Sequence, residues 1–333
     1  MKLKIAVAGV GYIARAHIAG LAKCDNLELA ALVTRNPEVA KAESERLKVP
    51  CYPSIREACA AAEIDIVDIC TPTYVHEQNI LEAVSCQKHV ICEKPITLTL
   101  ESFGRIRQAV EDAGVKFMVA QVLRFWPEYM RIRELYDKGL FGNVKICHAK
   151  RLCELPQWQT WFRESDKSGG AIYDLMLHDL DFVQNMFGDI ESVFATGAKN
   201  AAGSWNHALA NIRFKSGVGC VVEACEEAFG HFPFTMGMRI FGDEMILNFQ
   251  LTAGHNIDEP ATSAVYTYAR GSDPKLHDDI PQTDPFGNEL AYFADCILNG
   301  KPAARASLDS SETTLKLVLA VKRSLETGEV VVF

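Results

Sequence analysis

Lys4-Ile5-Ala6-Val7-Ala8-Gly9-Val10-Gly11-Tyr12-Ile13-Ala14 is the stretch that decides the fold of the N-terminal part of the chain. Its apolar first half predicts a buried strand, and the G-x-G-x-x-A spacing predicts a tight turn that opens a helix. Such a turn leaves bare backbone N–H groups at a helix N-terminus, where a diphosphate binds. The stretch therefore predicts a dinucleotide site formed by Gly9, Gly11, Tyr12, Ile13 and Ala14.

Strand and helix signals alternate from residue 4 to about residue 121. The expected strands are largely apolar runs, as in strands buried on both faces, at 4–8, 28–33, 64–70, 89–92 and 116–120. The expected helices lie between them, at 13–23, 37–47, 54–62, 75–86 and 100–113. This alternation predicts an α/β Rossmann domain with a doubly wound parallel sheet over residues 1–122, whose ligands bind at the carboxyl ends of the strands.

Strands dominate after a helix that ends near residue 138. They are expected at 144–152, 192–198, 208–214, 218–225, 235–241, 245–249 and 264–269. Tight turns at 215–217 and 242–243 join neighbours, so the sheet is expected to be antiparallel, and helices at 288–298 and 310–327 follow it. Residues 123–333 are therefore predicted to form an α+β domain, to which the family resemblance given below assigns substrate binding and oligomerisation.

Cofactor selectivity is expected at the end of the second strand, where Thr34-Arg35-Asn36 stands. A carboxylate there would bind the ribose hydroxyls of NAD, but this chain offers a hydroxyl and a guanidinium. Thr34 and Arg35 therefore favour NADP over NAD, because they can receive a 2′-phosphate. Arg35 could equally stack on the adenine of NAD, which leaves NAD open.

The third and fourth expected strands also end in polar residues. Thr71, Pro72, Thr73 and His76 follow the third strand, and Glu93-Lys94-Pro95 follows the fourth. All of these, Glu93 and Lys94 included, are expected to line the cofactor site at the carboxyl edge of the sheet. Pro95 ends the strand, so Lys94 is expected to point toward the nicotinamide. The alternative is a surface lysine that pairs with Glu93.

A second polar stretch runs from Ser168 to Asp181 and contains Gly169-Gly170. As a helix entered at the two glycines and ended by Gly188, it places Asp174, His178 and Asp181 on one face. Apolar residues occupy its other sides, so the polar stripe is expected to face a cleft. The alternative is that Asp174 only complements the helix N-terminus and that His178 is a satisfied core histidine.

Charge and cysteine content limit the possible partners and the compartment. The net charge of −9 argues against nucleic-acid and anionic-membrane binding, and no segment has the apolar length of a membrane span. The 11 cysteines are scattered and never spaced C-x-x-C, which predicts neither a disulfide framework nor a structural zinc site. We expect a cytoplasmic protein that binds small molecules or copies of itself.

Three motifs in this order, Gly9-x-Gly11-x-x-Ala14, Glu93-Lys94-Pro95 and Gly169-Gly170-x-x-x-Asp174-x-x-x-His178, resemble those of the Gfo/Idh/MocA family, which includes glucose-fructose oxidoreductase and inositol dehydrogenase. The resemblance covers nearly the whole chain. It implies a Rossmann domain followed by an open sheet that builds dimers or tetramers. It also implies NAD- or NADP-dependent oxidation or reduction of a sugar, cyclitol or similar polyol, with Lys94, Asp174 and His178 as catalytic residues.

The sequence departs from this family at two places. Many members have Asp where this chain has Thr34, which bears on the cofactor. Many also carry a glycine between the Asp and His, where this chain has Leu175-Met176-Leu177, so the shape on the substrate side is expected to differ.

The expected chemistry is removal of a hydride and a hydroxyl proton from a secondary alcohol. Histidine suits the base because its ordinary pKa of about 6.5 lets it accept and return a proton near neutrality. His178 is assigned that role, Lys94 holds the substrate oxygen, and Asp174 orients the substrate or Lys94. A proton transfer by Lys94 remains the alternative.

Four further residues are candidates for the substrate pocket, namely Arg124, Arg151, Trp158 and Trp161. Indole rings pack on sugar C–H faces, and arginines bind hydroxyl, carboxylate or phosphate groups. No metal is expected, although His178 and Asp181 have H-x-x-D spacing. Two rival functions remain: a non-catalytic dinucleotide and sugar sensor, and an oxidoreductase for a non-sugar such as an aromatic dihydrodiol.

Overall fold

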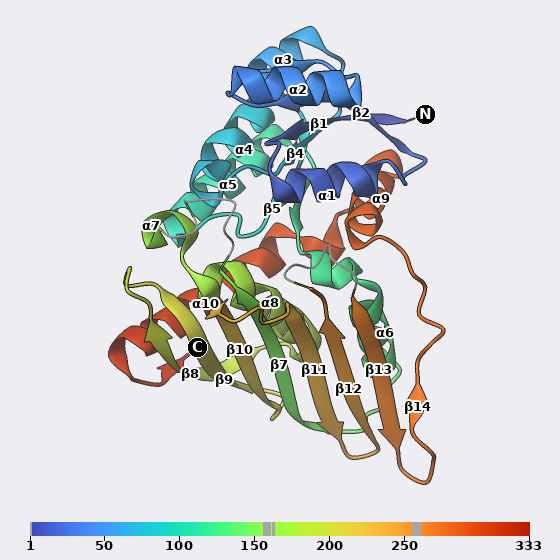
Figure 1. Ribbon diagram of the computed structural model, residues 1–333, viewed down its shortest axis with the longest axis vertical. Coiled ribbons are helices and arrows are strands. Elements are labelled where there is room, and N and C mark those ends of the chain that lie inside the picture. Colours follow the sequence, from blue (N-terminus) through green and yellow to red (C-terminus); the bar gives the residue numbers. More distant parts are fainter. Residues whose placement is uncertain (1, 156–160, 162–163, 255–260) are drawn as a thin grey trace. The chain divides into compact units, whose positions relative to one another are not determined.

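The computed structural model of the chain describes residues 2–155, 161, 164–254 and 261–333. These residues form two compact units (Figure 1). The first unit contains residues 1–126 and 283–312, and the second contains residues 127–282 and 313–333. Each unit is built around its own sheet, so the expected succession of a parallel sheet and a second sheet is confirmed.

The first unit holds a six-stranded sheet in the order β3-β2-β1-β4-β5-β6, and all its strand pairs are parallel. Its strands are β1 (Leu3–Ala8), β2 (Leu27–Val33), β3 (Cys51–Tyr52), β4 (Ile66–Ile69), β5 (His89–Glu93) and β6 (Phe117–Ala120). The two-residue strand β3 is absent from the sequence prediction because it is too short to show a pattern. The chain order reverses between β1 and β4, which marks the place where doubly wound sheets bind ligands.

Five helices connect these strands, namely α1 (Tyr12–Leu21), α2 (Pro37–Leu47), α3 (Ile55–Ala61), α4 (His76–Ser85) and α5 (Leu100–Ala113). Short 3₁₀ turns, η1 (Thr73–Val75) and η2 (Val122–Phe125), follow β4 and β6. The Ser54 hydroxyl accepts from Glu57 N at 3.2 Å, so Ser54 is the N-cap of α3.

The second unit contains a nine-stranded sheet in the order β14-β13-β12-β11-β7-β10-β9-β8-β15. Its strands are β7 (Val144–Glu154), β8 (Ile190–Lys199), β9 (Trp205–Phe214), β10 (Gly219–Ala228), β11 (Thr235–Gly242), β12 (Met245–Thr252), β13 (Thr262–Ala269), β14 (Lys275–Leu276) and β15 (Val331–Val332). The pair β7–β10 is parallel and the other pairs are antiparallel. The sheet is therefore mixed and mostly antiparallel.

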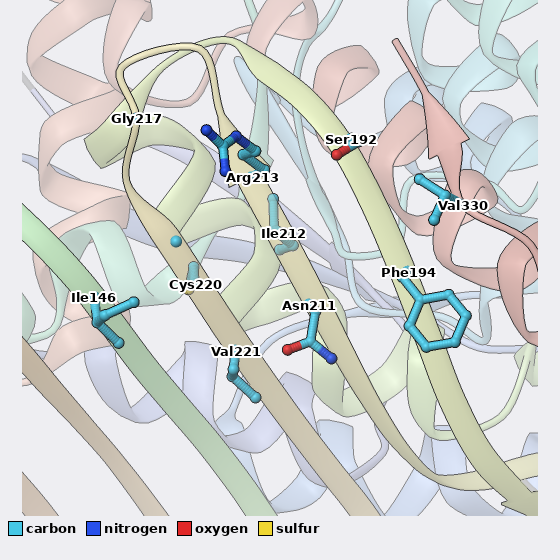
Figure 2. Close-up of a pocket in the computed structure, with 11 residues that line it drawn as sticks. Ile146, Ser192, Phe194, Asn211, Ile212, Arg213, Gly217, Cys220, Val221 and Val330 are labelled. Atoms are coloured by element: carbon cyan, nitrogen blue, oxygen red, sulfur yellow. The ribbon is translucent and has the colours of Figure 1, made fainter.

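The two faces of this sheet differ in burial. Strands β9 and β10 largely alternate between buried residues and more exposed ones, which is the pattern of a sheet covered on one side. Helices α6 (Pro127–Asp137), α8 (Leu177–Phe187) and α10 (Leu308–Thr327) lie on the covered side (Figure 1). The other face is open and carries a shallow pocket lined by Ile146, Phe194, Asn211 and Arg213, among others (Figure 2).

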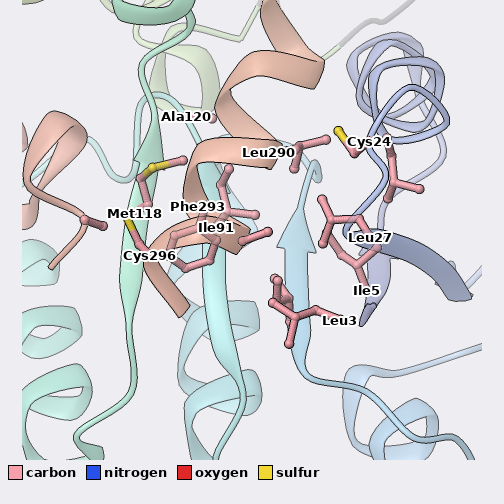
Figure 3. Close-up of a cluster of buried hydrophobic side chains, with 14 of the residues drawn as sticks. Leu3, Ile5, Cys24, Leu27, Ile91, Met118, Ala120, Leu290, Phe293 and Cys296 are labelled. Atoms are coloured by element: carbon pink, nitrogen blue, oxygen red, sulfur yellow. The ribbon is translucent and has the colours of Figure 1, made fainter. Parts of the chain in front are cut away.

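A late segment of the chain completes the core of the first unit. Helix α9 (Pro285–Leu298) inserts Leu290 and Phe293 among apolar side chains of the parallel sheet, such as Ile5 and Ile91 (Figure 3). The 3₁₀ turn η5 (Ala304–Ala306) adds Ala306 to the same cluster. The expected boundary at residue 122 therefore lies close to the first crossing between units, but the return of residues 283–312 was not part of that expectation.

Candidate functional site

The glycine turn after β1 has the backbone that a dinucleotide site needs. Gly9 has φ +99°, and a Cβ atom at this position would lie 2.6 Å from the carbonyl oxygen of Cys70. Gly11 is the N-cap of α1, so no side chain covers the first turn of the helix there. Ala14 is completely buried and packs with Val7, which brings the helix close to the strand. These residues fit a bound diphosphate.

The end of β2 presents Thr34 and Arg35 beyond the sheet. Thr34 N donates to the carbonyl of Tyr52 at 3.0 Å, which fixes the backbone. The Asn36 side chain accepts from Glu38 N and Val39 N at 3.0 and 3.2 Å, so it serves as the N-cap of α2. Arg35 is exposed. Of the three residues after this strand, Thr34 and Arg35 are the ones that remain as cofactor candidates.

His76 joins the two loops that follow β4 and β5. Its Nε2 lies 2.7 Å from the Thr71 carbonyl and its Nδ1 lies 2.9 Å from the Pro95 carbonyl. Burial lowers the pKa of His76, although both carbonyls oppose this shift. Thr71 also accepts from Asn79 through its hydroxyl at 2.9 Å. The buried ring of His76 therefore positions the loops, while Pro72 and the buried Thr73 start the 3₁₀ turn η1.

Lys94 follows the last residue of β5 and is partly buried. The Glu93 side chain is buried and accepts from the backbone N of Lys94 at 3.0 Å. The other oxygen of Glu93 lies 2.9 Å from Nε2 of His17. Glu93 thus holds the backbone of Lys94 from inside the unit, and the Lys94–Pro95 bond is cis.

In the second unit, two glycines make the sharp entry to the segment with Asp174 and His178. Gly169 and Gly170 have φ +80° and +72°, and Cβ atoms there would meet the Tyr173 ring at 2.4 Å and Asn206 Oδ1 at 3.2 Å. The chain then forms a π-helical turn, η4 (Ile172–Met176), which continues into α8. The single helix expected here is therefore a short helix α7 (Ser165–Ser168), a glycine break and a π turn ahead of α8.

Asp174 and His178 are partly buried at the junction of η4 and α8. Burial raises the pKa of the Cys153 thiol, and the charges of Glu226 and Asp174 raise it further. Asp181 does not share this environment: it is completely buried and accepts from the Thr314 hydroxyl at 2.8 Å. Asp181 is therefore an interior group, and the common face expected for Asp174 and His178 stays a prediction.

Arg151 is buried in an ion pair. Its Nε donates to Asp179 Oδ2 at 3.0 Å, and its Nη2 lies 3.3 Å from Asp179 Oδ1 and 3.4 Å from the Tyr129 hydroxyl. Desolvation raises the pKa of the Asp179 carboxyl, and Arg151 and Tyr129 offset part of the rise. The guanidinium of Arg151 is thus paired inside the second unit. We therefore do not include Arg151 in the proposed substrate pocket.

The remaining candidates for the substrate pocket have different surroundings. Arg124 is buried in the first unit and donates to the Arg305 carbonyl at 2.7 Å and to Ser310 Oγ at 3.1 Å. Trp161 is partly buried. Trp158 lies outside the described residues.

The sequence prediction missed the buried ionisable groups around Glu93 and Arg151. These are His17, Asp68, Asp179 and Glu289, all completely buried. Asp68 had a signal, because a charged residue within an apolar strand must have a buried partner. His17 and Glu289 had none, since one histidine and one glutamate on amphipathic helices are ordinary residues.

The fold and the glycine turn define a two-unit protein of the dinucleotide-binding Rossmann class. Residues 3–121 match the profile described as the oxidoreductase family with an NAD-binding Rossmann fold, and residues 129–248 match the Gfo/Idh/MocA C-terminal domain. The chain belongs to the Gfo/Idh/MocA family. No helix among the described residues is both long and apolar enough to cross a membrane.

Several known proteins are similar to this chain. The 2,7-anhydro-N-acetylneuraminate hydratase of Escherichia coli is 31% identical over 204 residues, which are 59% of this chain and 52% of that protein. The myo-inositol 2-dehydrogenase of Thermotoga maritima is 26% identical over 97% of this chain and 96% of its own length. The matched region is thus about half of the hydratase and nearly all of the dehydrogenase.

Among solved structures, the aldose-aldose oxidoreductase of Caulobacter crescentus in complex with glycerol has a TM-score of 0.89. It is 22% identical, with complete coverage of both chains. At this identity the likeness supports the fold alone.

Proposed function

We propose that the protein is an NAD(P)-dependent dehydrogenase that transfers a hydride between the nicotinamide and a secondary alcohol carbon of a sugar, cyclitol or sugar derivative. The observation that carries the proposal is the glycine turn of the first unit, with Lys94 at the end of another strand of the same sheet. The first unit has the uncapped glycine turn and Lys94, and the second has Asp174 and His178 at a glycine-built helix entry. The full-length similarity to a myo-inositol 2-dehydrogenase supports the substrate class.

Each proposed residue has one role. His178 accepts the hydroxyl proton during oxidation and returns it during reduction, as suits an imidazole near neutral pH. Lys94 holds the substrate oxygen and stabilises the negative charge that develops on it. Asp174 orients the substrate or Lys94. When bound at the glycine turn, the nicotinamide cofactor supplies or takes up the hydride.

The experiment is a screen for NAD(P)H formation across cyclitols, aldoses, sugar nucleotides and aromatic dihydrodiols. With a true substrate, His178→Asn should lower kcat by about 10²–10⁴-fold, because it removes the acid–base group. His207→Asn is the matched control, since His207 lies on an exposed strand position and pairs with Glu223 at 3.1 Å. Unchanged turnover in His178→Asn would refute the assigned role and favour proton transfer by Lys94.

The hydratase relative motivates a second candidate function. Adding water across a substrate leaves no net change in the redox state of a cofactor, so NAD(P)H would not accumulate. The same screen should therefore follow substrate loss by mass spectrometry as well as absorbance. Substrate consumption without NAD(P)H formation would favour the hydratase, and dinucleotide and sugar binding without any consumption would favour the sensor.

We propose NADP as the preferred cofactor, on the basis of the Thr34 hydroxyl and the exposed Arg35 at the end of β2. Arg35→Ala should raise the KM for NADP more than the KM for NAD, and Thr34→Asp should shift the preference toward NAD. Arg46→Ala is the control, because Arg46 is an exposed arginine that pairs with Glu43 at 2.5 Å. An Arg35→Ala variant that weakens NAD binding instead would show that the guanidinium stacks on adenine.

We infer that two copies of the chain associate through the open face of the nine-stranded sheet. Ile146, Phe241, Ile246 and Tyr268 are paired directly across β7, β11, β12 and β13, so they form one apolar row on one face. Ile146, Phe241 and Tyr268 are 50%, 38% and 42% exposed. Ile146→Lys should lower the mass seen by light scattering, whereas Lys215→Glu in the β9–β10 turn should not.

The 11 cysteines are all thiols in this structure, which supports a proposed location in a reducing compartment such as the cytoplasm.

A further inference from the structure

A completely buried group of ionisable side chains lies inside the first unit, behind Lys94. His17 from α1 is at its centre, with Nδ1 2.9 Å from Asp68 Oδ2 of β4 and Nε2 2.9 Å from Glu93 Oε1 of β5. Glu289 from α9 approaches the same Nε2 at 3.6 Å. Four elements therefore meet at one imidazole ring.

The surroundings of that ring favour its charged form. Both ring nitrogens face carboxyl oxygens at hydrogen-bond distance, and an ionised carboxylate only accepts. An imidazolium that donates from both nitrogens satisfies Asp68 and Glu93 together. Burial opposes this charge, but Asp68 and Cys70 prevail and hold the pKa of His17 well above its usual value.

The other groups around the ring are consistent with one positive charge. The Cys70 thiol donates to Asp68 Oδ1 at 3.4 Å, and the Phe286 ring packs at a centroid distance of 5.3 Å from His17. Burial raises the pKa of Glu289 well above its usual value, and neither of its oxygens has a hydrogen-bond partner among the described residues. Glu289 is thus the neutral member of the group.

The group connects with Lys94 through Glu93. Glu93 binds His17 with one carboxylate oxygen and the backbone N of Lys94 with the other, at 2.9 and 3.0 Å. On the opposite side of Lys94, the Pro95 carbonyl is held by His76. The backbone of Lys94 is therefore fixed on both sides, and one of the two links begins on α1, the helix that opens at the glycine turn.

We propose that His17, acting through Glu93, is a positioning residue that fixes Lys94 relative to the dinucleotide turn. The α1 helix places both the N-terminus that receives the diphosphate and the imidazolium that orients Glu93. This inference rests on the proposed function for its effect on turnover. The link itself is a property of the first unit and can be measured without a substrate.

The test compares His17→Gln with Glu289→Gln. Glutamine at position 17 removes the charge and one of the two directed N–H groups, whereas glutamine at position 289 keeps the shape of a neutral acid that does not bind Glu93 or Lys94. His17→Gln should lower kcat by about 10- to 100-fold, the size expected when a catalytic group is misplaced by about 1 Å. KM should change less than kcat, and Glu289→Gln should stay within about threefold of the wild type.

A spectroscopic readout separates this proposal from the proposed function. In wild-type protein labelled with ¹⁵N-histidine, His17 should show two protonated ring nitrogens throughout pH 6–8. The Lys94 amide should shift in His17→Gln and remain in place in Glu289→Gln. If no substrate is ever turned over but both signals behave in this way, the dehydrogenase proposal fails and the positioning link stands.

Four results would overturn the inference. One is a neutral His17 in the wild type, and another is an unshifted Lys94 amide in a folded His17→Gln variant. The third is a divalent metal bound at one per chain in the purified protein, because His17, Glu93 and Glu289 also offer a ligand set. Equal damage from Glu289→Gln would show that the group serves stability alone.

Discussion

Replacing Arg151 by methionine should destabilise the second unit far more than it affects substrate binding. The substitution leaves the Asp179 carboxylate buried without the guanidinium that binds both of its oxygens at 3.0 and 3.3 Å. Removal of one partner from a buried ion pair costs about 3–5 kcal/mol. In a unit of this size each kcal/mol lowers Tm by about 2–4 °C, so Tm should fall by about 6–20 °C.

The assay is a double-mutant cycle by urea and thermal unfolding, with Arg151→Met, Asp179→Leu and the combination. Each single variant should be strongly destabilised, and the double variant should recover a large part of the loss, because two apolar side chains replace a pair of charges. KM for the substrate, measured well below Tm, should stay within about threefold of the wild type. A stability loss below about 1 kcal/mol together with a large rise in KM would refute the reasoning and return Arg151 to the substrate pocket.

Three further predictions concern the first unit. Gly9→Ala should lower the free energy of unfolding by at least about 1–2 kcal/mol and weaken dinucleotide binding. The control is Gly114→Ala, which should leave the dinucleotide Kd unchanged. Gly114 has φ +64°, and no atom among the described residues lies within 4 Å of a Cβ placed there. The pKa of His17 is raised, so its contribution to the free energy of unfolding is complete below about pH 6.5 and is lost as pH rises through the folded pKa. Urea unfolding should therefore show the unit more stable at pH 6 than at pH 9. The difference between the two pH values should be smaller in His17→Gln. Phe293→Ala should lower the free energy of urea unfolding by about 3–5 kcal/mol. Leu298 is exposed on the same helix, so Leu298→Ala should lower it by less than about 1 kcal/mol. Equal losses would contradict the burial of Phe293 in the core of the first unit.

Local signals were sufficient to predict most of the fold. Helices α2 and α5 have the predicted bounds, because N-cap residues Asn36 and Thr99 start them and polar or glycine residues end them. The strands with long apolar or alternating runs were also found. The two-residue strands β3, β14 and β15 were missed because so short a segment has no period, and the parallel pairing of β7 with β10 depends on tertiary packing.

Residues of the candidate site divide in a similar way. Gly9, Gly169 and Gly170 were predictable because positive φ and close backbone approach leave a local sequence signature. The partners of buried charges leave no such signature, since Arg151 meets Asp179 and His17 meets Glu93 only after the fold has formed. This is why Arg151 was expected in the substrate pocket and His17 was not expected at all.

The return of residues 283–312 to the first unit affects how this protein can be made and altered. The backbone passes between the units three times, at 126/127, 282/283 and 312/313, so neither unit is a continuous piece of chain. During synthesis the parallel sheet lacks Leu290 and Phe293 until the chain has been made well beyond its own strands, past residue 293. An exchange of cofactor modules between relatives would therefore have to transplant two separate segments together, and a simple N-terminal fusion would leave apolar surface exposed.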